Sequence, residues 1–153
     1  MDINNLTFII TSYKSEKTIY NCLDSLPKNI NKIIVENSNN NELKINLERK
    51  YENLTCYVMK ENFGYGKANN YGINKTQNEY VFILNPDTII RRDAFRILID
   101  YLKNNNKVGC VGPKILNTDG TFQFSCRRKF PYIRYLLPKF FLLDKNFPHS
   151  RIL

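Results

Sequence analysis

The sequence has a single histidine, no tryptophan and no closely spaced pair of cysteines, and these absences argue against several kinds of site. His149 lies near the C-terminal end, which disfavours a serine or cysteine nucleophile with a histidine base. The four cysteines lack the clustered spacing of a zinc site. Each lies in an apolar pattern, so we expect all to be reduced and buried. They are Cys22, Cys56, Cys110 and Cys126.

Long hydrophobic runs are also absent. No apolar stretch approaches the ~20 residues that span a bilayer, and residues 1–5 lack the basic start and apolar core of a signal peptide. We therefore expect a cytoplasmic protein. With 153 residues, 42% of them hydrophobic and 24% charged, the chain fits one globular domain with a substantial core.

Acidic residues are scarce at the C-terminal end. Residues 127–153 hold seven Lys and Arg against Asp144 alone, whereas residues 1–126 hold 16 against 13. The net charge of +9 is thus concentrated in the last 27 residues, and the rest of the chain is close to neutral. This distribution differs from the basic face of a nucleic-acid-binding protein. It predicts a main domain over 1–126 and a basic, aromatic segment over 127–153.

What the sequence does contain is an alternation of apolar strands and amphipathic helices. Such an alternation predicts an α/β fold with a mostly parallel sheet. Ser15 is expected to cap the first helix, and the Asp-Gly pair at 119–120 predicts a β-hairpin over 115–124. Strands are expected at 6–10, 32–36, 54–59, 80–84 and 108–111. Helices are expected around the apolar stripes of 19–26, 43–51 and 95–102, and from about 65 to 75.

Polar residues follow three of these strands. In a parallel sheet the carboxyl ends of the strands share one edge, which is where α/β folds bind ligands. The side chains after the strands are therefore expected to lie close together. Two simpler alternatives stay open: Asp87 as an ordinary turn residue after Pro86, and Glu36 as a solvated strand end. The segments are Thr11-Ser12-Tyr13, Glu36-Asn37-Ser38 and Asn85-Pro86-Asp87.

Several ordered motifs in residues 6–131 resemble the family-2 glycosyltransferases of the GT-A fold, in particular their rhamnosyltransferase-like branch. The resemblance implies a Rossmann-related α/β sheet that binds a nucleotide-sugar donor. It also implies transfer of the sugar with inversion at the anomeric carbon. The motifs that carry it are "IITSYKSEKTIYNCLDSL", "KIIVENSNNN", "ENFGYGKANNYGI", "FILNPDT" and "VGCVGPKILNTDGTFQFSCRRKFP".

The resemblance assigns roles to the residues at the strand ends. Asp87 matches the position that holds Mg²⁺ or Mn²⁺, which neutralises the leaving diphosphate as a Lewis acid. Glu36 stands where the family usually has an aspartate that accepts the imide NH of uracil or thymine. Thr11 and Tyr13 match the remaining contacts to the base. Asn85 replaces a second acid, and its amide could orient a metal-bound water or a ribose hydroxyl.

The glycine-bearing stretch after the third strand supplies further candidates for nucleotide binding. Gly64 permits close approach of the backbone, Lys67 could reach a phosphate or the ribose, and Asn69 lies at the start of a helix expected to line the pocket. Asn37, which follows the second strand, is also predicted to bind the nucleotide. A dinucleotide-binding site is disfavoured. Asn69 stands where the Gly-x-Gly-x-x-Gly fingerprint has its third glycine, and the motif follows the third strand and not the first.

The resemblance also implies a downstream acidic motif that holds the catalytic base. Beyond Asp119 the only acidic side chain is Asp144, whose surroundings do not look like that motif. We therefore assign no catalytic residue. We expect a chain truncated after its donor-binding half, or a short product that binds the donor without efficient turnover.

The segment 127–153 mixes basic residues with Phe, Tyr and Leu, which suits an anionic membrane surface. Its prolines prevent one long amphipathic helix. A connecting segment that packs on other parts of a longer protein is the alternative. Peripheral membrane contact would place the protein at the inner face of the cell membrane, near a lipid-linked acceptor.

The predicted function is glycosyl transfer in cell-surface polysaccharide synthesis. The donor would be dTDP-rhamnose or a UDP-sugar, and the acceptor a saccharide or a lipid-linked glycan. A non-catalytic nucleotide-sugar-binding or scaffold protein is the alternative. A nucleic-acid-binding protein is a third possibility that the charge distribution disfavours. The sequence does not specify the donated sugar, the acceptor or the oligomeric state.

Overall fold

The computed structural model describes residues 5–91, 94–117, 119–121 and 123. The chain divides into two compact units, Met1–Val111 and Gly112–Leu153. The predicted boundary between residues 126 and 127 lies outside the described residues, as does the predicted basic segment. The first unit contains the sheet, all the helices given below and every predicted site residue.

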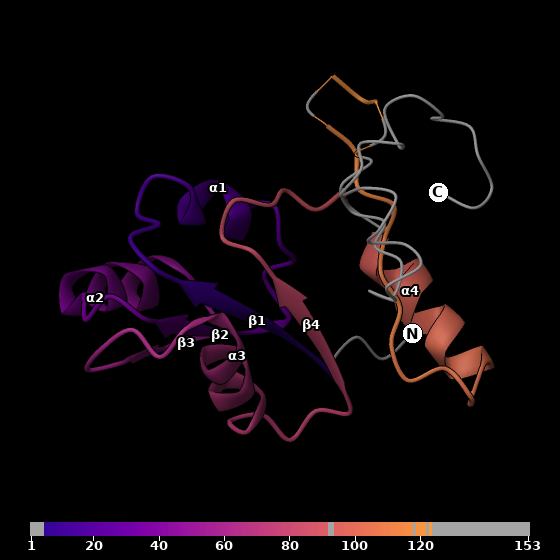
Figure 1. Ribbon diagram of the computed structural model, residues 1–153, viewed down its shortest axis with the longest axis horizontal. Helices are drawn as coiled ribbons and strands as arrows, with labels where there is room; N and C mark the ends of the chain where they lie inside the picture. The colour runs from indigo at the N-terminus through magenta and orange to yellow at the C-terminus, as the bar shows by residue number, and fades with distance from the viewer. Residues whose placement is uncertain (1–4, 92–93, 118, 122, 124–153) are drawn as a thin grey trace, which may run out of the picture. The chain divides into compact units, whose positions relative to one another are not determined.

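The centre of the first unit is a four-stranded parallel sheet with the strand order β3-β2-β1-β4 (Figure 1). Runs rich in β-branched residues form its strands, as expected for a sheet covered on both faces. The strands are β1 (Leu6–Ser12), β2 (Asn31–Glu36), β3 (Leu54–Val58) and β4 (Tyr80–Leu84). These bounds confirm four of the five predicted strands and the α/β class.

Helices lie on both faces of the sheet, as the crossover connections of parallel strands require, although Val81 and Ile83 of β4 stay exposed. In Figure 1 α3 lies on one side of the sheet and α1 on the other. The side chain of Asn40 caps α2 by accepting a hydrogen bond from the Leu43 N–H. The helices are α1 (Ile19–Asp24), α2 (Asn41–Lys50), α3 (Tyr65–Ile73) and α4 (Ala94–Asn104).

Alternating side chains of the strands build two hydrophobic clusters, one on each face of the sheet. The larger cluster joins the sheet to α1, α2 and α4, with Phe8 packed edge-on against Phe95 at 5.9 Å between ring centroids. The smaller cluster lies under α3 and includes Ile9, Val35 and Ala68. Packing on both faces holds the strands in place. Their carboxyl ends, where Thr11, Glu36 and Asn85 lie, form one edge of the sheet.

Three local predictions are wrong. Ser15 does not cap α1 with its side chain: its carbonyl accepts from Thr18 and Ile19, in a turn that precedes the helix. Residues 108–111 form no strand, because a turn from Asn105 to Val108 leads into irregular backbone. Cys110 is exposed, whereas Cys22 and Cys56 are buried as predicted.

In the second unit, backbone hydrogen bonds join Asn117 to Thr121 and Gln123 to Ile115, around a turn that contains Gly120 at φ +84°. This pairing agrees with the predicted hairpin. Cys126 lies outside the described residues. Among the residues that the structure does describe, no helix combines the length and the apolar character needed to cross a membrane.

Candidate functional site

The carboxyl ends of β1, β2 and β4 lie side by side. Ser12 pairs with Glu36 across β1 and β2, and Ile10 pairs with Leu84 across β1 and β4. The residues that follow each strand are therefore neighbours at one edge of the sheet. This register brings Thr11, Glu36 and Asn85 together, as the sequence predicted.

Glu36 is completely buried at the end of β2. Its Oε1 accepts hydrogen bonds from the backbone N–H of Ser38, at 2.7 Å, and from the Ser38 hydroxyl. Its Oε2 is also covered, yet it has no hydrogen-bond partner in the described part of the chain. A covered carboxylate oxygen without a donor is costly. Glu36 is therefore a buried acceptor with unused capacity, so its alternative role as a solvated strand end is wrong.

Ser12 is the neighbour of Glu36 in the sheet and is equally buried. Its hydroxyl is the other covered side-chain polar atom without a partner among the described residues. These two unpartnered atoms therefore lie on adjacent strands, at the carboxyl ends of β1 and β2. The sequence pattern alone does not distinguish Ser12 as a site residue, because its position beside Glu36 follows from the strand register.

Thr11 and Asn69 are joined by a buried hydrogen bond. The Thr11 hydroxyl donates to the Asn69 Oδ1 at 2.8 Å, which ties β1 to α3. Both residues are more than 90% buried. Their side chains therefore fix the helix against the strand, and the Thr11 backbone remains at the sheet edge.

Asn37 connects β2 to the glycine-bearing turn before α3. Its Oδ1 accepts from the Phe63 N–H at 3.0 Å, and its Nδ2 donates to the Asn62 Oδ1 at 2.7 Å. The same Asn62 oxygen accepts from the Gly64 N–H at 2.9 Å. Asn62 and Phe63 were not predicted as site residues, because their roles depend on contacts between distant segments.

Gly64 is the residue before α3 and has φ +78°. This left-handed conformation favours glycine, which explains the residue type. The Gly64 carbonyl then accepts from the Ala68 N–H in the first turn of the helix. Lys67 lies on that turn with an exposed side chain.

Tyr13 is 46% exposed just beyond β1, and the Lys14 ammonium group lies 5.5 Å from the centre of its ring. Lys14 has a positive φ of 51°, so the chain turns sharply at this point. The ring of Tyr13 is therefore available for packing against a planar ligand.

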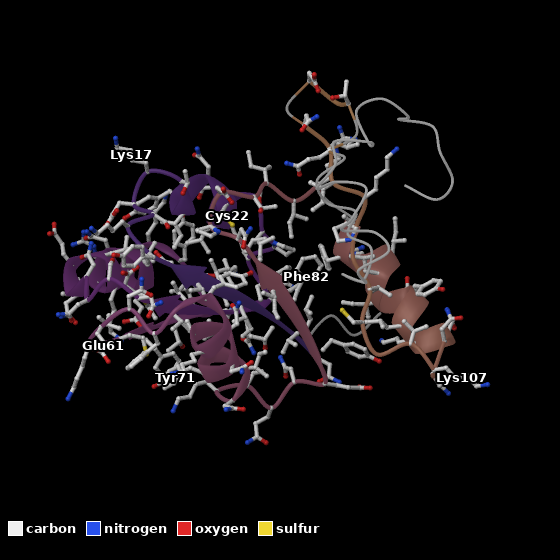
Figure 2. The ribbon with its side chains drawn as sticks, in the orientation of Figure 1. Lys17, Cys22, Glu61, Tyr71, Phe82 and Lys107 are labelled. Carbon is white, nitrogen blue, oxygen red and sulfur yellow. The ribbon has the colours of Figure 1, made fainter. Side chains whose placement is uncertain are left out.

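Asn85 follows β4 and has contacts with two helices. Its Oδ1 accepts from the Tyr65 hydroxyl at 3.0 Å, which connects the end of β4 to the start of α3. Its backbone carbonyl is 3.6 Å from the Sγ of Cys22, a residue of α1 that is labelled in Figure 2. Burial, and then the nearby Asp87 carboxylate, raise the pKa of the Cys22 thiol to about 12. Tyr65 and Cys22 are thus additional residues around the site.

Asp87 lies in the turn from Asn85 to Thr88 and is exposed. Within the described residues, no three His, Cys, Asp or Glu side chains group together as a metal site. The donor set therefore fits Mg²⁺ or Mn²⁺ only when a single carboxylate is supplemented by water and by the oxygens of a bound diphosphate. That mode of binding is usual for Mg²⁺ held beside substrate phosphates.

A separate pocket of about 520 Å³ lies at the start of β4, away from this edge. It is lined by Glu79, Tyr80 and Val81 and by residues of α4 and the turn after it. None of the predicted site residues lines this pocket.

Comparison with known proteins identifies the family. Residues 7–152 match the family described as "Glycosyl transferase family 2". A low-salt glycan biosynthesis hexosyltransferase, Agl10 of Haloferax volcanii, is 30% identical over 77% of this chain and 39% of its own length. A poly-beta-1,6-N-acetyl-D-glucosamine synthase of Staphylococcus aureus is 30% identical over 76% of this chain and 30% of its own length.

The fold has solved counterparts. S. aureus TarS aligns with a TM-score of 0.56 and 24% identity, covering 66% of this chain and 33% of the TarS chain. TarS has also been solved in complex with UDP-GlcNAc, with the same TM-score. At this identity the likeness establishes a shared GT-A-like fold. The chain spans less than half the length of these relatives, and it belongs to glycosyl transferase family 2.

Proposed function

We propose that this chain forms the donor-binding part of an inverting glycosyltransferase that uses a pyrimidine nucleotide-sugar and a divalent cation to build a cell-surface polysaccharide. The observation that carries the proposal is the buried Glu36 carboxylate at the shared edge of the strands, with one oxygen unpartnered in the described structure. The family membership supports the same reading.

Glu36 would bind the base. A carboxylate oxygen is a strong acceptor for the imide NH of uracil or thymine. Because Oε2 is covered, a base reaches it only after the residues around the carboxylate shift. The exposed ring of Tyr13 would pack on the base, and the backbone at Thr11 would contact its edge.

The diphosphate would lie between the end of β4 and the start of α3. Asp87 would hold the cation, which when bound neutralises the charge that develops on the leaving diphosphate. Lys67 would contact a phosphate or the ribose, and the backbone at Gly64 would allow close approach. Asn85, held by Tyr65, would orient a ribose hydroxyl or a metal-bound water.

The donor we would test first is dTDP-rhamnose, because the "FILNPDT" segment resembles the rhamnosyltransferase-like branch. UDP-sugars come next, since the TarS structure that shares this fold holds UDP-GlcNAc. The acceptor would be a saccharide or a lipid-linked glycan at the cytoplasmic face of the membrane. Sedimentation with anionic vesicles at low salt tests the membrane contact, and absence of binding would remove it.

A calorimetric titration with nucleotide diphosphates, with and without Mn²⁺, tests donor binding. Turnover then separates the enzyme from a non-catalytic nucleotide-sugar-binding or scaffold protein. Glycosyl transfer or donor hydrolysis by the 153-residue chain favours the enzyme. Tight donor binding with neither reaction favours the binding protein.

A further inference from the structure

We infer that Asn37 is a positioning residue that sets the affinity for the donor by holding the turn Asn62–Gly64, without contacting the donor itself. The inference rests on the proposed function, because it names what a residue of the same site does. It replaces the direct nucleotide contact that the sequence suggested for Asn37 with an indirect role.

The side-chain amide of Asn37 is buried and engaged in hydrogen bonds to the turn Asn62–Gly64. Its side chain is 98% buried and uses both ends of its amide: Oδ1 accepts from the Phe63 N–H, and Nδ2 donates to Asn62. The turn lies 25 residues further along the chain. A side chain so covered, with donor and acceptor both engaged by one turn, has little capacity left for a ligand.

The residue type fits this role. An aspartate would keep the acceptor for Phe63 but would lose the donor to Asn62, and would place two oxygens against each other. An alanine would leave the Phe63 N–H and the Asn62 oxygen without this partner. Only an amide of this length supplies one donor and one acceptor to the two positions.

Asn37 completes a set of three connections between strand ends and the start of α3. Thr11 of β1 bonds to Asn69, and Asn85 after β4 bonds to Tyr65. Asn37 after β2 bonds to the turn that precedes the helix. The first turns of α3 are therefore tied to the ends of β1, β2 and β4.

The turn needs such support because its conformation is unusual. Gly64 adopts φ +78°, and its carbonyl begins the hydrogen bonding of α3. A glycine turn has high conformational entropy when free. A turn held in place before the ligand arrives avoids the cost of ordering it on binding.

The test combines amide hydrogen exchange with UDP titration in the presence of Mn²⁺. Asn37→Ala should speed exchange at the Phe63 amide and weaken UDP binding, each by about fivefold, the factor for one neutral hydrogen bond. Asn62→Ala should speed exchange at Gly64, whereas Asn62→Asp keeps the acceptor oxygen and should preserve that protection. Asn46→Ala, on α2 and bonded to Arg49, is the control and should change neither quantity.

The possible results distinguish a failure of the positioning role of Asn37 from a failure of the proposed donor-binding function. Unchanged exchange at Phe63 in Asn37→Ala would overturn the positioning role. Weaker UDP binding with unchanged exchange would also overturn it, because it would indicate a direct contact. If the unchanged protein binds no pyrimidine diphosphate, the proposed function fails together with the effect on affinity, while the exchange data still decide whether Asn37 holds the turn.

Discussion

Asp87 is an exposed side chain in a turn, so its charge can be removed without opening a cavity in the core. We expect Asp87→Ala to abolish the Mn²⁺-dependent part of UDP or dTDP binding and to change the free energy of unfolding by less than about 0.5 kcal/mol, as is usual for surface substitutions. Calorimetry and urea unfolding measure the two effects.

Asp100, which is exposed on α4, offers the matched control. Asp100→Ala removes the same charge at a distance from the strand ends and should leave metal-dependent binding unchanged. Equal losses in both variants would mean that net charge, and not a cation at Asp87, governs the affinity.

Glu36 provides a test of base recognition. We expect Glu36→Ala to weaken the binding of UDP and dTDP by about 1.5–3 kcal/mol, the contribution of a hydrogen bond to a charged group. The binding of pyrophosphate should change much less, because pyrophosphate has no imide NH. Calorimetric titrations with the three ligands make the comparison, and equal losses for all of them would refute the role in base reading.

Cys22 should make stability depend on alkaline pH. Burial raises the pKa of its thiol from 9.0 to about 12, so the folded state binds the proton more tightly than the unfolded state. The resulting stabilisation is complete below about pH 9 and is lost as the pH rises through 12. Cys22→Ser keeps a hydroxyl donor to Asn85 and should reduce the loss of stability over this range by about 1.4 kcal/mol per pH unit.

The measurement is urea unfolding at several pH values between 9 and 12. The pKa of the Cys56 thiol is raised to about 12 in the same way, mainly by burial, so some dependence should remain in Cys22→Ser. Cys110 is exposed, and Cys110→Ser serves as the control for replacing a cysteine outside the core. An identical slope in Cys22→Ser would contradict a protonated, buried Cys22.

At the scale of elements, the close contact between α3 and the sheet depends on Gly72. A Cβ added there would lie 2.8 Å from the Ile9 Cγ2 and 3.1 Å from the Val35 Cγ2. We expect Gly72→Ala to destabilise the protein by about 1–3 kcal/mol through overpacking. The turn at Gly64 directly precedes α3, so a shift of α3 would displace that turn. Nucleotide binding should therefore weaken as well.

Gly66 on the same helix is the matched control. A Cβ added there meets nothing within 4 Å, so Gly66→Ala should gain about 1 kcal/mol from helix propensity. Urea unfolding of both variants should give shifts of opposite sign. A destabilised Gly66→Ala together with a neutral Gly72→Ala would contradict the packing of α3 on β1 and β2.

Most elements could be predicted because each is encoded locally. Apolar runs such as 6–12 and 31–36 form strands, and the stripe of Leu43 and Leu47 faces the core of the protein. Residues 108–111 show the limit of this reasoning: an apolar run becomes a strand only when a neighbour pairs with it, and in the described structure this one has none.

The approximate positions of the site residues at the strand ends were also predictable, since the carboxyl ends of parallel strands lie along one edge of the sheet. The hydrogen bonds that these residues make were not predictable. The bonds of Asn37 to Asn62 and of Asn85 to Tyr65 join segments 20 or more residues apart, and depend on side-chain directions that periodicity does not specify. The hydrogen bonds of Ser38 to Glu36 Oε1 and the burial of Oε2 likewise depend on how the chain turns after β2.

At the scale of the whole molecule, the ends of β1, β2 and β4 form one polar edge above two apolar clusters. The clusters provide the rigid base that preorganised binding requires. In the described part of the chain, the edge combines a buried acid at Glu36, an exposed ring at Tyr13 and an exposed acid at Asp87. A pyrimidine diphosphate with its cation would use all three.

The most direct test is a calorimetric titration of the unchanged protein with UDP, dTDP and ADP, each with and without Mn²⁺. The account predicts binding of UDP or dTDP that depends on Mn²⁺, and much weaker binding of ADP. Equal affinity for all three nucleotides, binding that ignores the metal, or no binding at all would contradict a pyrimidine diphosphate site at the strand ends.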